Sequence, residues 1–228
     1  MQVTASTLAQ IAGTGANSNM RSVVAGLTAL PSGLDRPHRL AHYLGQLAHE
    51  SGAWRYDREV WGPTPAQQRY DTRTDLGNTA ARDGDGYLYR GRTGMQITGK
   101  SNYRQYRDWC RGSGLPAPDF VAQPDLVLTD PWEGLGPIWY WSTRELNLLA
   151  DGNGLDAITI RINGGTNGID DRRAKYVRAA LVLLGYGPTQ IREFQRAEHI
   201  GADGIAGPTT RATLHAALTH LQPVTFGA

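Results

Sequence analysis

Apolar side chains between residues 36 and 51 follow the period of a helix that buries one face. Leu40, Tyr43, Leu44, Leu47 and Ala48 recur at spacings of three and four residues, which is typical of an amphipathic helix. Asp35 is the expected N-cap, Pro37 suits the first turn, and Gly52 favours an end to the helix. The pattern therefore predicts one well-defined helix that stops close to Glu50.

Helical patterns return several times in the second half of the chain. They cover residues 102–111, 132–147, 155–162, 170–184, 189–199 and 208–218. Strand signals are scarce, and a short alternating piece over residues 87–97 predicts no more than a small hairpin. We therefore expect a mainly α-helical protein whose functional site is carried by loops.

Two interruptions divide this pattern. Residues 61–89 are rich in the Gly, Pro, Asn and Asp of turns, and so long a stretch without regular structure inside a compact domain is usually functional. Gly and Pro residues at 185–188 then separate residues 1–186, the expected catalytic domain, from residues 187–228. A module of about 40 residues is marginal for independent folding, so it is expected to pack on the main domain.

Composition narrows the classes of protein. The 228 residues are 40% hydrophobic and 19% charged, without an apolar run long enough to span a bilayer, which indicates a soluble globular chain. The first residues do not resemble a secretory signal. Cys110 is the single cysteine, which rules out an internal disulfide framework and fits a reducing compartment.

Charge indicates the kind of partner. The formal net charge is only +2, but basic residues gather in one part of the chain: Arg82, Arg90, Arg92, Lys100, Arg104, Arg107 and Arg111. Such a local excess suits an anionic polymer such as a cell wall. The dense basic stripe of a nucleic-acid-binding protein is missing, so no nucleic-acid partner is expected.

Glu50 and Glu59 are the candidate chemical pair. Glycosidases commonly use one carboxylic acid to protonate the leaving oxygen and a second carboxylate, about 6.5–9.5 Å away in inverting enzymes, to activate water. A continuous helix would separate the two residues by roughly 13 Å, whereas a turn at Gly52 would bring them closer. The alternative is structural: Glu50 pairs with an arginine at the helix end, and Glu59 pairs with Arg55 or Arg58.

The polar, glycine-containing segment 89–103 supplies groups that could hold the attacking water and bind the sugar. Thr98 could hold the attacking water, while Gln96 and Asn102 could bind the acetamido groups of an amino sugar. Glycines in the segment would let a substrate approach the backbone. A second polar turn begins with Asn163-Gly164-Gly165, and this turn could equally be an ordinary connection between helices.

These motifs resemble glycoside hydrolase family 19, the family of plant-type chitinases, and in particular its bacteriophage endolysin branch. The resemblance spans roughly residues 4–185. The matching motifs are His49-Glu50-Ser51, Glu59, the run 75–79, the signature 89–103, Ile162-Asn163-Gly164-Gly165 and Asp171-Arg172. The implied fold is a lysozyme-like, chitinase-like helical domain with long functional loops.

The resemblance also implies roles for individual residues. Glu50 is the implied general acid, Glu59 the implied general base, and Thr98 the hydroxyl that positions water. Residues implied to contact or tune the substrate are Thr64, Tyr89, Gln96, Asn102, Asn163 and Arg172. The implied mechanism is single displacement with inversion, without a metal or another cofactor. Thr93 is a departure, because the family signature more often has glycine there, so the turn could differ in shape.

The C-terminal segment is similar to the small helical peptidoglycan-binding domain of wall hydrolases. Its expected wall-binding residues are Phe194, Gln195, Asp203 and Gly204. The alternative is a helical hairpin that only covers the catalytic domain.

Together these expectations favour a monomeric endolysin-type enzyme that cuts peptidoglycan glycan strands between N-acetylated amino sugars. It would be made in a host cytoplasm without a signal peptide, would not insert into the membrane, and would act on the wall after permeabilisation. A chitinase is the runner-up. A metal-dependent wall amidase using His42 and His49 is disfavoured because His-Glu-x-x-His is absent, and a non-catalytic wall-binding protein is disfavoured because both acids are present.

Overall fold

The computed structural model describes residues 1–227, which form a mainly helical protein. Its helices are α1 (Ala5–Ala12), α2 (Ser18–Ala29), α3 (Pro37–Glu50), α4 (Pro65–Tyr70), α5 (Asp85–Leu88), α6 (Lys100–Gly112), α7 (Trp132–Thr143), α8 (Leu146–Asp151), α9 (Leu155–Asn163), α10 (Ile169–Leu183), α11 (Ile191–Ala197) and α12 (Pro208–Thr219). Two 3-10 turns, η1 (Thr74–Leu76) and η2 (Pro124–Leu128), and two strands, β1 (Gln2–Val3) and β2 (Thr225–Phe226), complete the order. The predicted fold class is confirmed.

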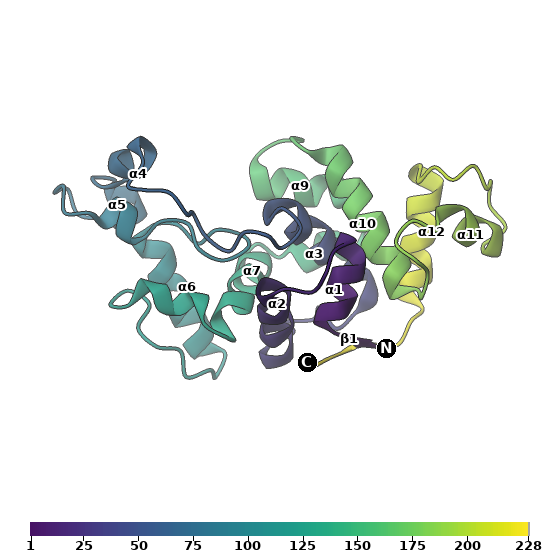
Figure 1. Cartoon of the computed structure of the whole chain (residues 1–228), viewed down its shortest axis with the longest axis horizontal. Coiled ribbons are helices and arrows are strands. Elements are labelled where there is room, and N and C mark those ends of the chain that lie inside the picture. The colour runs from purple at the N-terminus through teal and green to yellow at the C-terminus, as the bar shows by residue number, and fades with distance from the viewer. Residues whose placement is uncertain (228) are drawn as a thin grey trace.

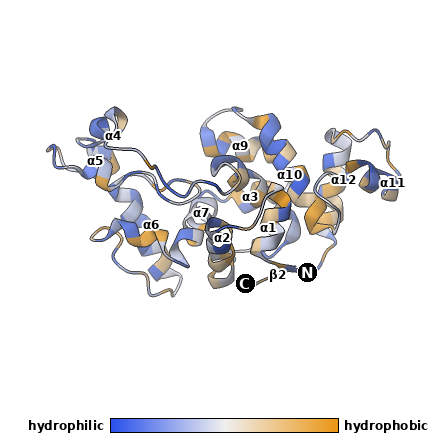
Figure 2. Cartoon of the chain, viewed as in Figure 1, coloured by the Kyte–Doolittle hydropathy of each residue, from blue (hydrophilic) through white to orange (hydrophobic). Residues whose placement is uncertain are grey.

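The molecule is elongated, with α4, α5 and α6 at one end and α11 and α12 at the other (Figure 1). Between these ends, α3 and α10 form the central layer, and α2 packs on α7. The ribbon of α4 and α5 is mostly hydrophilic, whereas hydrophobic residues gather where α10 meets α12 (Figure 2). Among residues 1–227, no helix has both the length and the apolar character needed to cross a bilayer.

Helix α3 is the buried axis of the protein. The predicted apolar stripe from Leu40 to Ala48 is buried, and the residues between its members are buried too, as expected of a helix enclosed on all sides. Its partner α10 comes very close, since a Cβ on Gly45 would lie 2.8 Å from Tyr176 Cα. The helix leaves the core only in its last turn, which carries Glu50 to the surface.

The observed caps of α3 agree with the prediction at the C-terminal end but not at the N-terminal end. The N-cap is Arg36 rather than the predicted Asp35, and the side chain of Arg36 forms no capping hydrogen bond. The end after Glu50 agrees with the prediction, because Ser51 is the C-cap and Gly52 adopts a left-handed φ of 59°.

The chain between residues 61 and 98 is irregular but contains short elements. Helices α4 and α5 and the turn η1 occupy the stretch predicted as loops. The hairpin predicted over residues 87–97 is smaller than expected, because α5 occupies its start and a single antiparallel bridge joins Arg92 to Ile97. Another bridge pairs Arg92 with Arg58, so two segments far apart in sequence run side by side.

The single helix predicted over residues 132–147 is wrong. Helix α7 ends at Thr143 and α8 begins at Leu146, because Glu145 takes a left-handed φ of 54° that no helix continues through. The other predicted helices are confirmed with shifts of at most two residues at their ends, the usual uncertainty of helix boundaries.

The C-terminal segment packs on the main body of the protein. Helix α12 contacts both α3 and α10, and His215 of α12 packs against the rings of His38 and His42. Strand β2 then returns to pair in parallel with β1, matching Gln2 with Thr225. The division into domains at residues 186 and 187 stays a prediction.

Candidate active site

Glu50 stands at the open end of α3 and is fixed from one side. Its Oε1 accepts a 2.6 Å hydrogen bond from Nη2 of Arg172, a residue of α10 that is only 2% exposed. The same guanidinium donates to Gln46 Oε1 in the α3 turn before. Oε2 of Glu50 has no hydrogen-bond partner among residues 1–227. One oxygen of the acid is therefore occupied and the other is open.

Glu59 lies on the irregular segment after α3 and is held differently. Its backbone N–H donates to Gly91 O at 2.9 Å, and its Oε2 accepts from Gln67 Nε2 at 2.7 Å. Its other oxygen, Oε1, has no hydrogen-bond partner in the described part of the chain. Like Glu50, Glu59 has one restrained oxygen and one free oxygen.

A tight turn over residues 91–98 connects the two acids. At one end, Gly91 accepts the Glu59 backbone hydrogen bond. Three residues later, Gly94 presses on the end of α3, since a Cβ there would lie 2.8 Å from Leu47 Cδ1 and 3.7 Å from Ser51 Cβ. Three residues span at most about 11 Å. The turn therefore brings the backbone of Glu59 into the neighbourhood of the α3 end that carries Glu50.

Gly91 is also the point on which two predicted side chains converge. A Cβ at this position would meet Gln96 Oε1 at 2.1 Å and Thr98 Oγ1 at 3.2 Å, so the glycine makes room for both. Asn102 lies just behind and donates from Nδ2 to Thr98 O at 2.7 Å. The side chains of Gln96 and Thr98 and the backbone of Glu59 therefore all lie next to Gly91. Asn102 helps to position Thr98.

The departure at Thr93 does not abolish the tight turn. Thr93 adopts a φ of 67° and Gln96 a φ of 51°, the left-handed conformation that glycine takes most easily. The Thr93 side chain is buried and packs against Gly136 of α7. A β-branched residue therefore occupies a conformation that normally disfavours it.

The loop that includes Asn163 contacts Arg172, the arginine that binds Glu50. Asn163 closes this loop on itself, because Nδ2 donates to Asn167 O at 3.0 Å and Oδ1 accepts from Gly165 N at 2.8 Å. Asn167 O also accepts from Arg172 Nε at 3.4 Å. The loop is therefore coupled to the arginine that fixes Glu50.

Tyr140 stands near the same acid. Its hydroxyl donates to Ile162 O at 3.0 Å. Burial raises the pKa of Tyr140, and the negative charge of Glu50 adds to the rise. Tyr140 therefore remains a neutral hydrogen-bonding group beside Glu50.

Two residues expected to contact substrate have structural surroundings instead. Tyr89 is 4% exposed, and its hydroxyl donates to Val121 O at 2.9 Å. Thr64 is the N-cap of α4, where it exchanges hydrogen bonds with Gln67 in a capping box. Thr64 thus lies close to Glu59 through Gln67 rather than through its own hydroxyl.

Two of the four expected wall-binding residues are internal. Phe194 is fully buried against Tyr186. Gln195 is buried as well, where its Nε2 donates to Asp203 Oδ1 at 2.8 Å and its Oε1 accepts from Gly204 N at 2.8 Å. Asp203 is exposed and Gly204 is half-buried. Gln195, Asp203 and Gly204 therefore hold the loop between α11 and α12 together.

Two residues near Glu59 were not predicted from the sequence. Gln67 is 3% exposed and holds Glu59, and the Thr64-Pro65-Ala66-Gln67 pattern of a capping box is the signal that could have revealed it. Trp61 is 81% exposed two residues after Glu59. A large aromatic side chain so open to solvent beside a candidate acid is a ready contact surface for a ligand.

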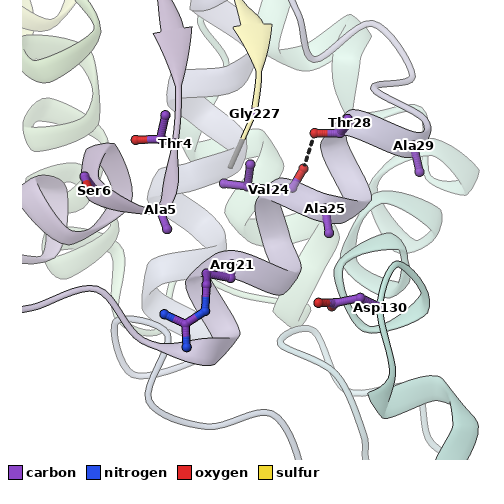
Figure 3. Close-up of a pocket in the computed structure, with 10 residues that line it drawn as sticks. All are labelled: Thr4, Ala5, Ser6, Arg21, Val24, Ala25, Thr28, Ala29, Asp130 and Gly227. Atoms are coloured by element: carbon purple, nitrogen blue, oxygen red, sulfur yellow. Dashed lines mark hydrogen bonds between the residues drawn. The ribbon is translucent and has the colours of Figure 1, made fainter.

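A cavity outside the candidate site has a volume of about 730 Å³. It lies between α1 and α2, with Arg21 and Asp130 at its edge (Figure 3). Its other lining side chains are mostly small, and the one hydrogen bond among the residues drawn joins Thr28 to Val24 O. None of the candidate site residues lines this cavity.

The residues considered for a metal site do not gather. His42 is buried and stacks on Tyr176, whereas His49 pairs with Asp171 at 2.5 Å. In residues 1–227, no three His, Cys, Asp or Glu side chains are placed to share an ion. The arrangement that remains is two carboxyl groups, each with one free oxygen, next to a hydroxyl and a carboxamide. Such a set can transfer protons to and from a bound glycoside and a water molecule.

Comparison with known proteins shows which sequences and structures this chain is similar to. No family model matches the chain. A glycosyl hydrolase family 19 domain-containing protein of Haemophilus influenzae is 34% identical over 167 residues, which is 62% of this chain and 78% of that protein. An endochitinase of Arabidopsis thaliana is 32% identical over 127 residues, covering 55% of this chain but 39% of the plant protein.

Solved structures show the same fold. Chitinase C from Streptomyces griseus superposes with a TM-score of 0.59 at 20% identity, covering 80% of this chain and 76% of that chain. A bacterial family 19 chitinase gives a TM-score of 0.59 at 22% identity, covering 80% and 95%. A class IV chitinase from Zea mays gives 0.55 at 19% identity, covering 78% and 90%.

The family 19 relative and the chitinase-like helical fold define a glycosidase, and its substrate is a carbohydrate. The similarity to the Haemophilus influenzae protein is high enough, over enough of its length, to place the family. The chain belongs to glycosyl hydrolase family 19.

Proposed function

We propose that this glycosidase cleaves the glycan strand of bacterial peptidoglycan between N-acetylated amino sugars, in the manner of a phage endolysin. Glu50 acts as the general acid and Glu59 as the general base of a single displacement with inversion. The observation that carries the proposal is the turn over residues 91–98, whose Gly91 binds the Glu59 backbone while its Gly94 packs on the α3 end.

The proposed step balances with these groups alone. Glu50 gives a proton from Oε2 to the glycosidic oxygen, since Oε1 already accepts from Arg172. The bond between that oxygen and the anomeric carbon breaks as water attacks the carbon from the opposite face. Glu59 takes the water proton on Oε1, because Oε2 is occupied by Gln67. The anomeric configuration inverts.

The surrounding polar groups suit an N-acetylated sugar. Thr98 Oγ1 lies beside Gly91 and has no hydrogen-bond partner among residues 1–227, so it is available to orient the water. Gln96 is exposed at the same turn and can bond to an acetamido group. The open face of Trp61 can pack against a sugar ring.

The choice of peptidoglycan over chitin rests on features outside the acid pair. The cluster of basic side chains between residues 82 and 111 favours an anionic polymer. We assign wall contact in residues 187–228 to exposed positions such as Ile205, since Phe194 and Gln195 are internal. Chitin is the second candidate, supported by the relatives named as chitinases.

We further propose that the enzyme works as a monomer and reaches the wall from a cytoplasm after the membrane is permeabilised. The lone cysteine, Cys110, is buried and unpaired, as suits a reducing compartment. Expressed in the cytoplasm of a bacterium, the protein should lyse the cells only after the cytoplasmic membrane is permeabilised, and lysis with an intact membrane would contradict this route.

Digestion of purified peptidoglycan and of chitin oligomers, followed by mass spectrometry, tests the substrate. We expect disaccharide-containing fragments with new reducing ends from peptidoglycan, and none from the same protein carrying Glu50→Gln. Cleavage of chitin oligomers alone would make the enzyme a chitinase. Release of peptides from uncut glycan strands, abolished by a chelator, would replace the proposal with an amidase.

A further inference from the structure

A second cavity lies where α9, α10 and α12 meet. It has a volume of about 280 Å³ and is lined by Asn153, Gly154 and the first turn of α9, by Tyr176 of α10 and by Arg211 of α12. It therefore forms where the C-terminal segment packs on the main body. The size is at the low end for ligand sites, which suits a small chemical group rather than a polymer.

The cavity is lined by donors that lack acceptors. Tyr176 is 1% exposed, and its hydroxyl has no hydrogen-bond partner in the described chain. Buried polar atoms are nearly always paired, so an unpaired one next to a cavity indicates a missing partner. The backbone amides of Asp156 and Ala157, in the first turn of α9, also find no acceptor among residues 1–227. These amides are the positive end of the helix.

Arg211 adds a full positive charge. Its Nη1 donates to Ala206 O at 2.6 Å, which leaves the rest of the guanidinium available. Within residues 1–227 it forms no ion pair, whereas Arg173 bonds Asp156 at 2.8 Å and Asp170 at 3.1 Å. The Asp156 carboxylate at the rim is therefore already neutralised, and the charge of Arg211 is not.

The floor of the cavity adds no competing charge near neutral pH. Tyr176 stacks on His42 with ring centroids 4.4 Å apart. Burial lowers the pKa of His42 to about 3, so this histidine stays neutral. Burial also raises the pKa of Tyr176, so its hydroxyl keeps its proton and can only donate to an anion.

We propose that this cavity binds a carboxylate, held by the Arg211 guanidinium, the Tyr176 hydroxyl and the first-turn amides of α9. A planar carboxylate offers two oxygens with several lone pairs, which matches a guanidinium fork and additional N–H and O–H donors. The identity of this carboxylate rests on the proposed function: it is the terminal carboxylate of a wall peptide. The site would then anchor the peptide part of the substrate at a distance from the two acids.

Titration of the full-length protein with small probes, followed by amide chemical shifts, tests the site without any glycan cleavage. N-acetyl-D-alanine represents the peptide terminus, N-acetylmuramic acid a carboxylate on the sugar, and N-acetylglucosamine an uncharged sugar. We expect N-acetyl-D-alanine to shift the Asp156 and Ala157 amides saturably, and N-acetylglucosamine to leave them unchanged. Stronger binding of N-acetylmuramic acid would keep the carboxylate site but move its source to the glycan.

Variants separate binding from folding. Arg211→Gln should weaken binding of the carboxylate probe at least tenfold. Arg196→Gln, which removes an exposed arginine of α11, should leave this binding unchanged. Tyr176→Phe should weaken binding severalfold while the melting temperature stays the same or rises, because it removes an unpaired buried hydroxyl. The absence of a saturable shift with either carboxylate, or equal binding by Arg211→Gln, would overturn the site. Because cleavage is not measured, the site and the proposed activity can fail separately.

Discussion

The two candidate acids are supported by different kinds of structure. Glu50 ends a helix that is buried on every side, and its partner Arg172 lies in the core of the neighbouring helix. Glu59 lies on an irregular segment and is held by a backbone hydrogen bond to Gly91 and by the Gln67 side chain. The first arrangement depends on core packing, whereas the second depends on a few directed hydrogen bonds.

This difference shows how one fold can hold one reacting carboxylate rigidly and leave the position of the other open to local adjustment. A carboxylate on a packed helix moves only if the core moves. A carboxylate on a loop can be repositioned by changing a single cap or turn. Substitutions on the two sides should therefore differ in how they divide between activity and stability.

Removing either acid gives the largest expected effect. Glu50→Gln and Glu59→Gln should each lower cleavage of peptidoglycan by about 10³-fold or more, because each deletes one proton transfer. Circular dichroism and the melting temperature should remain close to those of the unmodified protein. If Glu59→Gln cleaved peptidoglycan at a near-normal rate, Glu59 would have no part in the mechanism, and the comparison of two catalytic acids would fail.

Arg172 should affect activity and stability together. Arg172→Met removes a charge-assisted hydrogen bond to Glu50, of about 1.5–3 kcal/mol, so kcat/KM should fall roughly 10- to 100-fold. The free energy of unfolding should also fall, by about 3 kcal/mol, because a buried network loses its cation. Kinetics and denaturant unfolding measure the two effects.

The matched control is Arg173→Met, since Arg173 follows Arg172 but forms only surface ion pairs with Asp156 and Asp170. It should cost no more than about 1 kcal/mol and leave kcat unchanged. If both variants behaved alike, the buried position of Arg172 would have no special role.

Gln67 should affect both activity and stability. Gln67→Ala frees Glu59 Oε2 and removes half of the α4 capping box, so we expect kcat to fall about tenfold and the free energy of unfolding to fall by about 1–3 kcal/mol. Thr64→Val removes the N-cap of α4, at a cost of about 1 kcal/mol, and should change kcat only a few fold. Gln68→Ala is the control, because Gln68 is exposed beside Gln67. A loss in Thr64→Val as deep as in Gln67→Ala would show that the Thr64 hydroxyl itself meets the substrate.

Glu133 of α7 gives the smallest effect and makes the stability of the fold sensitive to pH. Burial, with the charges of Asp57 and Asp130, raises the pKa of Glu133 to about 7. The folded protein therefore holds a proton that the unfolded chain releases near pH 4.5, so stability is full below that value and is lost as pH rises to about 7. We expect roughly 1–2 kcal/mol, less than the full shift implies, because water still reaches the group. Glu133→Gln should flatten this part of the stability profile.

The sequence predicted the helical side of the site well. The period of Leu40, Leu44 and Leu47 identified α3, and the turn at Gly52 located its end. The placement of Glu50 followed directly, because a helix is determined by local spacing.

The loop side could not be predicted to the same depth. The contacts of Glu59 with Gly91 and Gln67 join segments whose pairing no local pattern encodes. Burial is not encoded locally either, since Tyr89 and Phe194 are enclosed by tertiary packing. The break at Glu145 depends on one left-handed residue, which its sequence neighbours do not signal.

The stereochemistry of the first product tests the central claim most directly. Proton NMR spectra recorded during the first minutes of cleavage of a β-linked substrate distinguish the two anomers before they interconvert. Because water attacks from the face opposite the leaving oxygen, the account predicts that the α-anomer appears first. Initial release of the β-anomer would contradict it, since retention requires a covalent or neighbouring-group intermediate in place of a Glu59-activated water.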